Sequence, residues 1–220
     1  MDTAAAIDAM KDMDKKGDPL PALLRAATEG DAAAQHDVAG MFYQGKGAPK
    51  DDRLALQWYL KAAEQGEVDD QYIVGMFYDR GIGTKPDPKK AAHWFEKAAK
   101  QGDAEAQFAL AAAYDSGVGV PQDTEKAMKW YRSAAKQGDA PAARNLGLVY
   151  YHDKKDFQSS FEWFEKAAEA GDADGQVMLA TQYAMGQGVK RDVPTAVKWL
   201  KKAKAQGNED AASLLNALGH

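Results

Sequence analysis

The segment of this chain whose residue types come closest to known chemistry is rich in glycine. Gly40-Met-Phe-Tyr-Gln-Gly45-Lys46-Gly47 matches most of a phosphate-binding P-loop. A P-loop also needs a Ser or Thr that binds magnesium, and it follows a strand, whereas this segment continues a helical pattern. Later Gly-x-Gly segments lack the third glycine of a dinucleotide-binding fingerprint. We therefore interpret these glycines as turn residues.

Metal ligation and nucleophilic catalysis have equally little support. Asp12-Met-Asp14 resembles the start of a calcium loop, but Lys16 and Leu23 stand where ligand residues belong. The chain has no cysteine, which excludes disulfides, thiolate catalysis and sulfur-ligated zinc. We expect no enzymatic activity, no metal and no cofactor. The four histidines form no i, i+4 pair of the kind that binds zinc on a helix; they are His36, His93, His152 and His220.

Composition limits the partners. The chain has 28 Lys and Arg against 33 Asp and Glu, a formal net charge of −5, and both signs are scattered along it. Nucleic-acid binding needs a concentrated cationic face, so we expect no nucleic-acid partner. No apolar run approaches the ~20 residues of a membrane span, so we expect no membrane span. We also expect the chain to be a monomer. No secretory leader is evident at the start. The compartment stays open: periplasmic if a leader has been removed, otherwise cytoplasmic.

Five tryptophans reveal the elements that carry these residues. Their separations are 36, 36, 33 and 36 residues. A large apolar residue follows each one, a small residue lies three positions before it, and an alanine lies four positions after it. Such spacing puts the small residues and the tryptophan on one helical face, so we predict that the tryptophans form a repeating core. The tryptophans are Trp58, Trp94, Trp130, Trp163 and Trp199.

A second helix precedes each tryptophan helix. Glycine followed by Asp, Glu or Asn recurs between the units, as at Gly102-Asp103, and this pair is typical of one helix ending and the next beginning. From Asp103 the apolar residues follow the i, i+3, i+4, i+7, i+8 stripe of an amphipathic helix. A Gly-x-Gly loop, often followed by Asp, joins the two helices. The unit is therefore helix, glycine-rich turn, helix.

These patterns predict an all-α repeat solenoid with five full repeats and a cap at each end. Residues 1–29 should form N-terminal cap helices, and residues 207–220 a C-terminal capping helix. Terminal units lack one neighbour and are more polar. The five repeats between them are 30–65, 66–101, 102–137, 138–170 and 171–206.

The repeat Gly102-Asp-Ala-Glu-Ala-Gln-Phe-Ala-Leu-Ala-Ala-Ala-Tyr, with Lys126-Ala-Met-Lys-Trp-Tyr after the loop, closely resembles the Sel1-like repeat. The resemblance covers nearly the whole chain. It implies a right-handed superhelix related to tetratricopeptide arrays, with the first helices lining a concave surface. It also implies a bacterial scaffold or regulator that binds other proteins, with a toxin-immunity protein among the possibilities.

The fourth repeat departs from this pattern. Its loop is three residues shorter and lacks both glycines, and Ala143 replaces a glutamine that recurs at Gln35, Gln71, Gln107 and Gln176. Residues 151–155 occupy the shortened loop. Either the loop has been trimmed without consequence, as surface loops tolerate, or it forms a specific contact patch.

Residues that vary between repeats, at positions that the fold does not need, are the candidate contacts. They lie on the first helices beside the core stripe and include types enriched at interfaces. Packing between repeats is the alternative explanation. The predicted partner-binding residues are His36, Tyr43, Tyr72, Met76, Asp79, Phe108, Arg144, Tyr151 and His152.

These patterns are compatible with two functions. The first is a non-enzymatic scaffold, adaptor or inhibitor that binds a protein on the concave face. The alternative is a bacterial envelope factor that binds peptidoglycan or another glycan, since aromatic side chains also stack on sugars.

Overall fold

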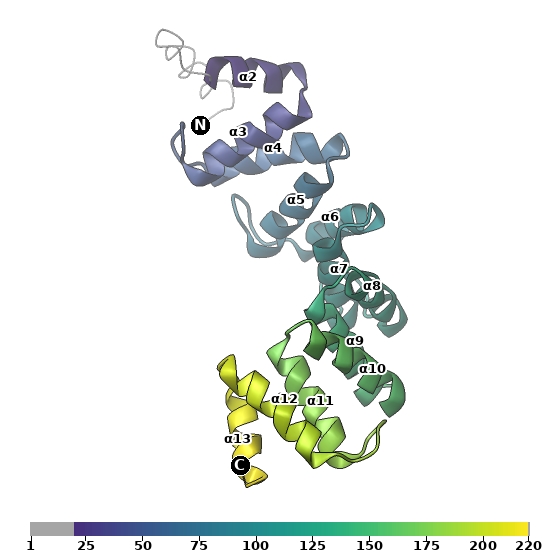
Figure 1. Cartoon of the computed structure of the whole chain (residues 1–220). Helices are drawn as coiled ribbons and strands as arrows, with labels where there is room; N and C mark the ends of the chain where they lie inside the picture. Colours follow the sequence, from purple (N-terminus) through teal and green to yellow (C-terminus); the bar gives the residue numbers. More distant parts are fainter. Residues whose placement is uncertain (1–19, 220) are drawn as a thin grey trace. The chain divides into compact units, whose positions relative to one another are not determined.

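The computed structural model describes residues 20–219, and all regular secondary structure within them is helical (Figure 1). Part of the predicted N-terminal cap, including Asp12 to Lys16, lies outside these residues. The first helices of the repeats are α3 (Ala32–Gln44), α5 (Val68–Arg80), α7 (Ala104–Ser116), α9 (Ala140–His152) and α11 (Ala173–Met185). The second helices are α4 (Asp52–Glu64), α6 (Pro88–Lys100), α8 (Thr124–Lys136), α10 (Phe157–Glu169) and α12 (Val193–Ala205). Helices α2 (Leu20–Glu29) and α13 (Glu209–Ala217) flank them.

The described residues fall into two compact units. The first comprises residues 20–106 with 117–121, and the second residues 107–116 with 122–219. Within the first unit, α3 packs on α4 and α5 on α6, while α2 and α4 pack on the first helices that follow them. The same alternation joins α9, α10, α11, α12 and α13 in the second unit. The helix pairs predicted from the sequence are therefore confirmed.

Capping explains where the helices begin. Each second helix follows an aspartate whose carboxylate accepts a backbone N–H of the first turn, as Asp51 does from Leu54 at 3.0 Å. Most first helices begin in the same way, as at Asp31 and Asp172. Glu67 is the exception, because it has the extended backbone of a cap but no capping hydrogen bond from its side chain.

The Gly-x-Gly loops need glycine for two physical reasons. Gly81 and Gly83 have φ values of 70° and 68°, in the left-handed region that costs other residues energy. A Cβ on Gly83 would also lie 2.2 Å from the carbonyl oxygen of Asp52. In the fourth repeat Lys155 adopts φ 54° instead, and it is the one residue other than glycine with positive φ among residues 20–219.

The core is repetitive, but the tryptophans contribute to it unequally. Trp58 and Trp94 are buried, whereas Trp130, Trp163 and Trp199 are only half-buried. These three still pack against the core clusters of the second unit, so the predicted tryptophan core is confirmed there with only partial burial of the rings. The most consistently buried large side chain is the one after each tryptophan, with 1–7% exposure. These residues are Tyr59, Phe95, Tyr131, Phe164 and Leu200.

Lysine side chains lie over all five tryptophan rings, and in four cases the lysine is three positions after the tryptophan. The ammonium of Lys61 lies 3.8 Å from the centroid of the Trp58 ring, and that of Lys202 lies 3.9 Å from the Trp199 ring. Each of these lysines is one helical turn after its tryptophan, which places the cation over the ring face. The half-buried Trp130, Trp163 and Trp199 therefore lie at the outer border of the core.

The recurring glutamine forms a buried link. Gln71 donates to the carbonyl of Ala63 at 3.1 Å, and its own side-chain oxygen accepts from Gln101 at 2.9 Å. The corresponding amide pairs in other repeats are Gln35 with Gln65, Gln107 with Gln137, and Gln176 with Gln206. In the fourth repeat both positions are alanine, Ala143 and Ala170. The pair is therefore lost as a whole, which avoids burying one amide without its partner.

Candidate protein-binding surface

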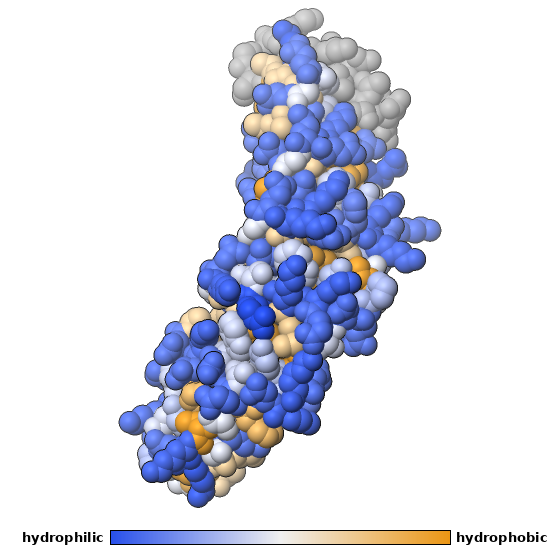
Figure 2. All heavy atoms as spheres, turned by 90° about the vertical axis from the view of Figure 1, so that its right-hand side faces the viewer, coloured by the Kyte–Doolittle hydropathy of each residue, from blue (hydrophilic) through white to orange (hydrophobic). Residues whose placement is uncertain are grey.

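The predicted contact stripe starts at one residue of each first helix, namely His36, Tyr72, Phe108, Arg144 or Val177. We define the first-helix surface as the residues four and seven positions after these starts. In the first unit these residues are Gly40, Tyr43, Met76 and Asp79. In the second unit they are Ala112, Asp115, Leu148, Tyr151, Thr181 and Ala184. All are at least partly exposed. The face drawn in Figure 2 is largely hydrophilic, with small separate apolar patches.

The residues that start the stripe reach toward the next repeat. In the first unit, Nδ1 of His36 lies 2.8 Å from Oδ1 of Asp70. The ring of Tyr72 lies 5.8 Å from that of Phe95, and its hydroxyl is hydrogen-bonded to Glu105. These contacts join α3 to α5 and α5 to the start of α7. His36 and Tyr72 therefore pack between repeats.

The second unit repeats this arrangement with different chemistry. Arg144 extends from α9 to the beginning of α11, where it forms ion pairs with Asp174 at 2.7 Å and Asp172 at 3.3 Å. Phe108 is half-buried, with its ring 5.9 Å from that of Tyr131. Arg144 and Phe108 thus have structural partners within the unit.

The other predicted contacts are more accessible. Tyr43 is 37% exposed although its ring lies 5.2 Å from that of Phe77. Asp79 and His152 are exposed, and Met76 is half-buried. Tyr151 donates its hydroxyl to the side-chain oxygen of Gln187 at 2.9 Å. These side chains remain candidates for contact with a partner.

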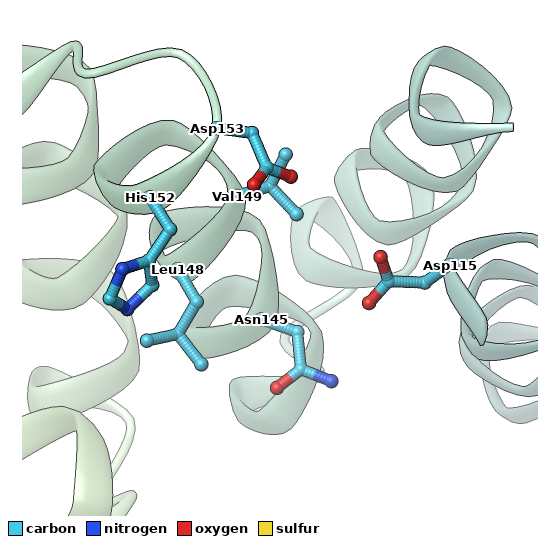
Figure 3. A pocket seen from close by; sticks show the side chains of 6 residues that line it. All are labelled: Asp115, Asn145, Leu148, Val149, His152 and Asp153. Atoms are coloured by element: carbon cyan, nitrogen blue, oxygen red, sulfur yellow. The ribbon is translucent and has the colours of Figure 1, made fainter.

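A hollow of about 230 Å³ lies on this surface of the second unit, between α7 and α9 (Figure 3). Asp115, at the end of α7, points toward the side chains of α9. The hollow combines carboxylates, an amide, an imidazole and aliphatic groups, so it offers several kinds of contact. Its lining from α9 and the residue after it is Asn145, Leu148, Val149, His152 and Asp153.

The polar groups of this hollow share one hydroxyl. Tyr131 donates toward Asp115 over 3.4 Å, while the amide nitrogen of Asn145 approaches the same hydroxyl at 3.3 Å. Burial raises the pKa of Asp115, the hydrogen bond from Tyr131 lowers it, and the nearby charge of Asp153 raises it. Burial also raises the pKa of Tyr131 to about 12. Tyr131 therefore remains a neutral donor that holds both side chains in place.

Sequence reasoning found this hollow only in part. His152 was a predicted contact, and Asp115 and Leu148 lie on the predicted stripe, but Asn145 and Val149 do not. Asn145 is difficult to find because the equivalent positions of other repeats carry Asp37, Ile73, Ala109 and Met178, without a common type.

In the first unit, sequence reasoning missed a buried carboxylate. Asp70 is 2% exposed and lines a hollow of about 210 Å³ with His36 and the start of α5. Burial raises the pKa of Asp70, and the hydrogen bond with His36 lowers it. The sequence does mark Asp70 as unusual when the repeats are aligned. The equivalent position in each other repeat has a small residue: Ala34, Ala106, Ala142 and Gly175.

Within residues 20–219, no group of three or more His, Asp or Glu side chains is arranged to hold a metal ion. In the same range no helix has the length and apolar character to cross a membrane.

Comparison with known proteins agrees with this geometry. The Sel1 repeat profile matches residues 32–67, 68–103, 104–139, 140–172 and 173–208, each beginning two residues after the predicted repeat boundary. No curated protein matches the sequence.

Solved structures are more informative. The protective antigen c5321 of uropathogenic Escherichia coli is 34% identical, with a TM-score of 0.82; the match covers 86% of this chain and 41% of that one. A Sel1 repeat protein from Oxalobacter formigenes is 36% identical, with a TM-score of 0.73, and covers 89% of this chain and 57% of that one. This chain thus spans roughly half the length of either relative.

A third structure, the immunity protein PA5088 from Pseudomonas aeruginosa, is 22% identical with a TM-score of 0.50. The match covers 81% of this chain and 68% of that one, and it shows a common fold alone. The five matched repeats and the two closer structures lead to one conclusion: the chain belongs to the Sel1 repeat family.

Proposed function

We propose that this chain is a non-enzymatic protein-binding module that contacts a protein partner through its first-helix surface. The observation that carries the proposal is the α7–α9 hollow, which is open to solvent and lined by both charged and aliphatic side chains. Such a mixture suits an anchor residue of a partner, because hot spots combine apolar burial with a few placed polar groups.

Variation along the first-helix surface supports the proposal. Buried positions of the repeat keep the same residue types, such as the fully buried Ala62, Ala98 and Ala134. By contrast, one position of the first helices carries Gly40, Met76, Ala112, Leu148 and Thr181 in turn. A surface that differs from repeat to repeat can match one partner along its length, which is how solenoids achieve specific binding.

Hydroxyl groups give no support for nucleophilic catalysis. Ser116 and Ser133 donate to backbone carbonyls of their own helices, and Ser159 and Thr195 donate to the capping carboxylates of Asp156 and Asp192. A nucleophile needs an adjacent base that is itself oriented by a third group. These hydroxyls are instead engaged in local hydrogen bonds of their own helices, in keeping with a binding function.

An immunity or regulatory role is the narrower form of this proposal, in which the partner is a toxin or an effector protein. The Pseudomonas aeruginosa immunity protein shares the fold, and that likeness motivates a search among secreted toxins of the source organism. The identity of the bound protein decides between this role and that of an adaptor.

Site-specific photocrosslinking tests the proposal. The photoreactive residue p-benzoylphenylalanine is placed at position 148 on α9, and at position 162 on second helix α10 as the matched control. A protein crosslinked at position 148 is identified by mass spectrometry, purified and titrated by calorimetry. We expect Leu148→Ser to weaken its binding by about 1–2 kcal/mol and Glu162→Ser to leave it unchanged.

The opposite pattern would contradict the proposal: unchanged affinity for Leu148→Ser and Asn145→Ala, with loss for Glu162→Ser, would place the interface on the second helices. Circular dichroism melts of each variant check that the affinity change does not come from unfolding, because Leu148 also packs beside buried core residues.

A further inference from the structure

Charge is divided between the two kinds of helix. The five first helices carry seven acidic residues and two basic ones, whereas the five second helices carry seven acidic and fifteen basic residues. This division is hidden in the sequence, because the helices alternate and their charges mix along the chain. A partner that contacts the first helices therefore meets a negative potential, which favours a positively charged surface.

The α7–α9 hollow places this negative charge where a side chain can enter. Asp115 lies on one side and Asp153 on the other, and the amide of Asn145 lies between the two helices (Figure 3). The Asn145 nitrogen is directed to Tyr131, which leaves the Asn145 oxygen as an acceptor for an incoming donor. Leu148 and Val149 provide an aliphatic wall beside these acceptors.

Two basic residues that adjoin lining residues in the sequence, Lys154 and Arg144, have other partners. Lys154 forms an ion pair with Glu125, and Arg144 forms its two ion pairs at the start of α11. Within residues 20–219 neither Asp115 nor Asp153 has a basic side chain in an ion pair. Neither carboxylate is therefore held in an ion pair within the described part of the chain, although the charge of Asp153 also acts on Lys154.

We infer that the α7–α9 hollow receives a lysine or arginine side chain of the protein partner. The aliphatic stem packs along Leu148 and Val149, and the cationic head donates to Asp115, Asp153 and the oxygen of Asn145. Lysine and arginine combine an apolar stem with a charged head, which is the combination that this lining offers. The inference rests on the proposed function and deepens it, because it names the chemistry of the partner's anchor.

The test uses two blocked peptides of the same length, Ac-Ala-Arg-Ala-NH2 and its citrulline counterpart, which has nearly the same shape but no charge. Each is titrated into the full chain and followed by NMR, with the side-chain amide of Asn145 as reporter. We expect the arginine peptide to shift this signal and the citrulline peptide to bind about tenfold more weakly, since a charged donor strengthens hydrogen bonds to carboxylates.

Three variants locate the effect. Asp115→Asn and Asp153→Asn should each weaken the binding of the arginine peptide by about tenfold. Glu162→Gln is the control, because Glu162 is an exposed carboxylate on second helix α10, outside the hollow and outside the first-helix surface, and it should change binding less than about twofold. Asp153 follows α9 and is exposed, so Asp153→Asn remains informative if Asp115→Asn disturbs the Tyr131 network.

Equal binding of the two peptides, or full binding by both hollow variants, would overturn the inference. The proposed function fails separately. A crosslinked partner could bind more weakly to Leu148→Ser but equally well to Asp115→Asn and Asp153→Asn. That result would support the protein-binding surface and contradict the basic anchor. Unchanged affinity of the partner for every first-helix variant would contradict the proposed binding surface itself.

Discussion

The side-chain nitrogen of Gln182 lies 2.7 Å from the hydroxyl oxygen of Ser160, and both residues are at most 1% exposed. Gln182 also donates to the carbonyl of Phe157 at 3.2 Å. The four other repeats have alanine in place of Ser160 and an apolar residue in place of Gln182. A buried polar pair has therefore replaced two apolar side chains at once.

Ser160→Ala should destabilise the protein by about 1–2 kcal/mol although alanine is the usual residue at that position, because the buried Gln182 amide loses an acceptor. Adding Gln182→Met should recover most of the loss. Urea titrations of the two single variants and the double variant measure this coupling. Additive losses would show that the two side chains act independently.

Gln71 and Gln101 should also be coupled. Removing Gln101 leaves the side-chain oxygen of the buried Gln71 without its partner, and removing Gln71 takes a donor from the carbonyl of the buried Ala63, so Gln71→Ala and Gln101→Ala should each cost about 1–2 kcal/mol. The double variant should cost less than the sum by about 1 kcal/mol. Urea unfolding followed by circular dichroism checks this, and a double variant that equals or exceeds the sum would contradict it.

The loss of stability when a core aromatic side chain is replaced by alanine should depend on how deeply that side chain is buried rather than on its size. Tyr131 is 1% exposed and Trp130 is half-buried, so Tyr131→Ala should cost about 3–5 kcal/mol and Trp130→Ala about 2 kcal/mol or less. Trp58, at the same repeat position as Trp130 but 1% exposed, is the comparison, and Trp58→Ala should exceed Trp130→Ala. Equal losses in denaturant titrations would refute a border position for Trp130.

Asp70→Ala should stabilise the first unit near neutral pH by about 1 kcal/mol, because it removes a buried charge and restores the small residue of the other repeats. Burial raises the pKa of Asp70 above its usual 3.8 despite the hydrogen bond with His36, so the folded state binds this proton more readily than the unfolded state. Its contribution is therefore unfavourable above the raised pKa and is relieved as pH falls toward 3.8.

Melting curves between pH 3.5 and 7 compare wild type with Asp70→Ala and with Asp69→Ala, an exposed neighbour. The stability difference between wild type and Asp70→Ala should shrink as pH falls. His36, Glu67 and Asp69 also influence Asp70, and the Asp69→Ala control accounts for the titration of the exposed neighbour Asp69. A constant difference across this range would show that ionisation of Asp70 has no part in stability.

Lys155→Gly should stabilise the protein by about 0.5–1 kcal/mol, because lysine pays a steric cost at φ 54° that glycine does not. Lys155→Ala is the control: it removes the same charge but keeps a Cβ, so it should give no gain. Thermal melts of both variants test this, and an equal gain from alanine would assign the effect to charge rather than to backbone conformation.

Periodicity alone predicts the helices, their order and the glycine turns, because a 36-residue pattern averages over many positions. It fails where one repeat differs from the others. The half-burial of Trp163 depends on how its helix packs, which composition does not reveal, and the carboxylate of Asp70 is read as a surface charge unless the repeats are aligned position by position. Contacts such as Arg144 with Asp174 require knowing which first helices are neighbours.

The hollow shows the same limit for function. Its residues come from the end of α7, from the part of α9 between Asn145 and His152, and from Asp153 after that helix, so no single segment contains the pattern. Variation at Leu148 and Tyr151 could be read from the sequence, whereas the approach of Asp115 to Asn145 through Tyr131 depends on the fold.

The glutamine pair has a consequence for how such arrays grow. Both members, such as Gln71 and Gln101, lie within one predicted repeat. Duplication or deletion of a whole repeat therefore keeps every pair intact. Recombination between the two helices of a repeat could instead join half of the fourth repeat, which has Ala143 and Ala170, to half of another repeat. The resulting repeat would have one glutamine of the pair without the other. Chimeric arrays should accordingly tolerate junctions between repeats better than junctions within them.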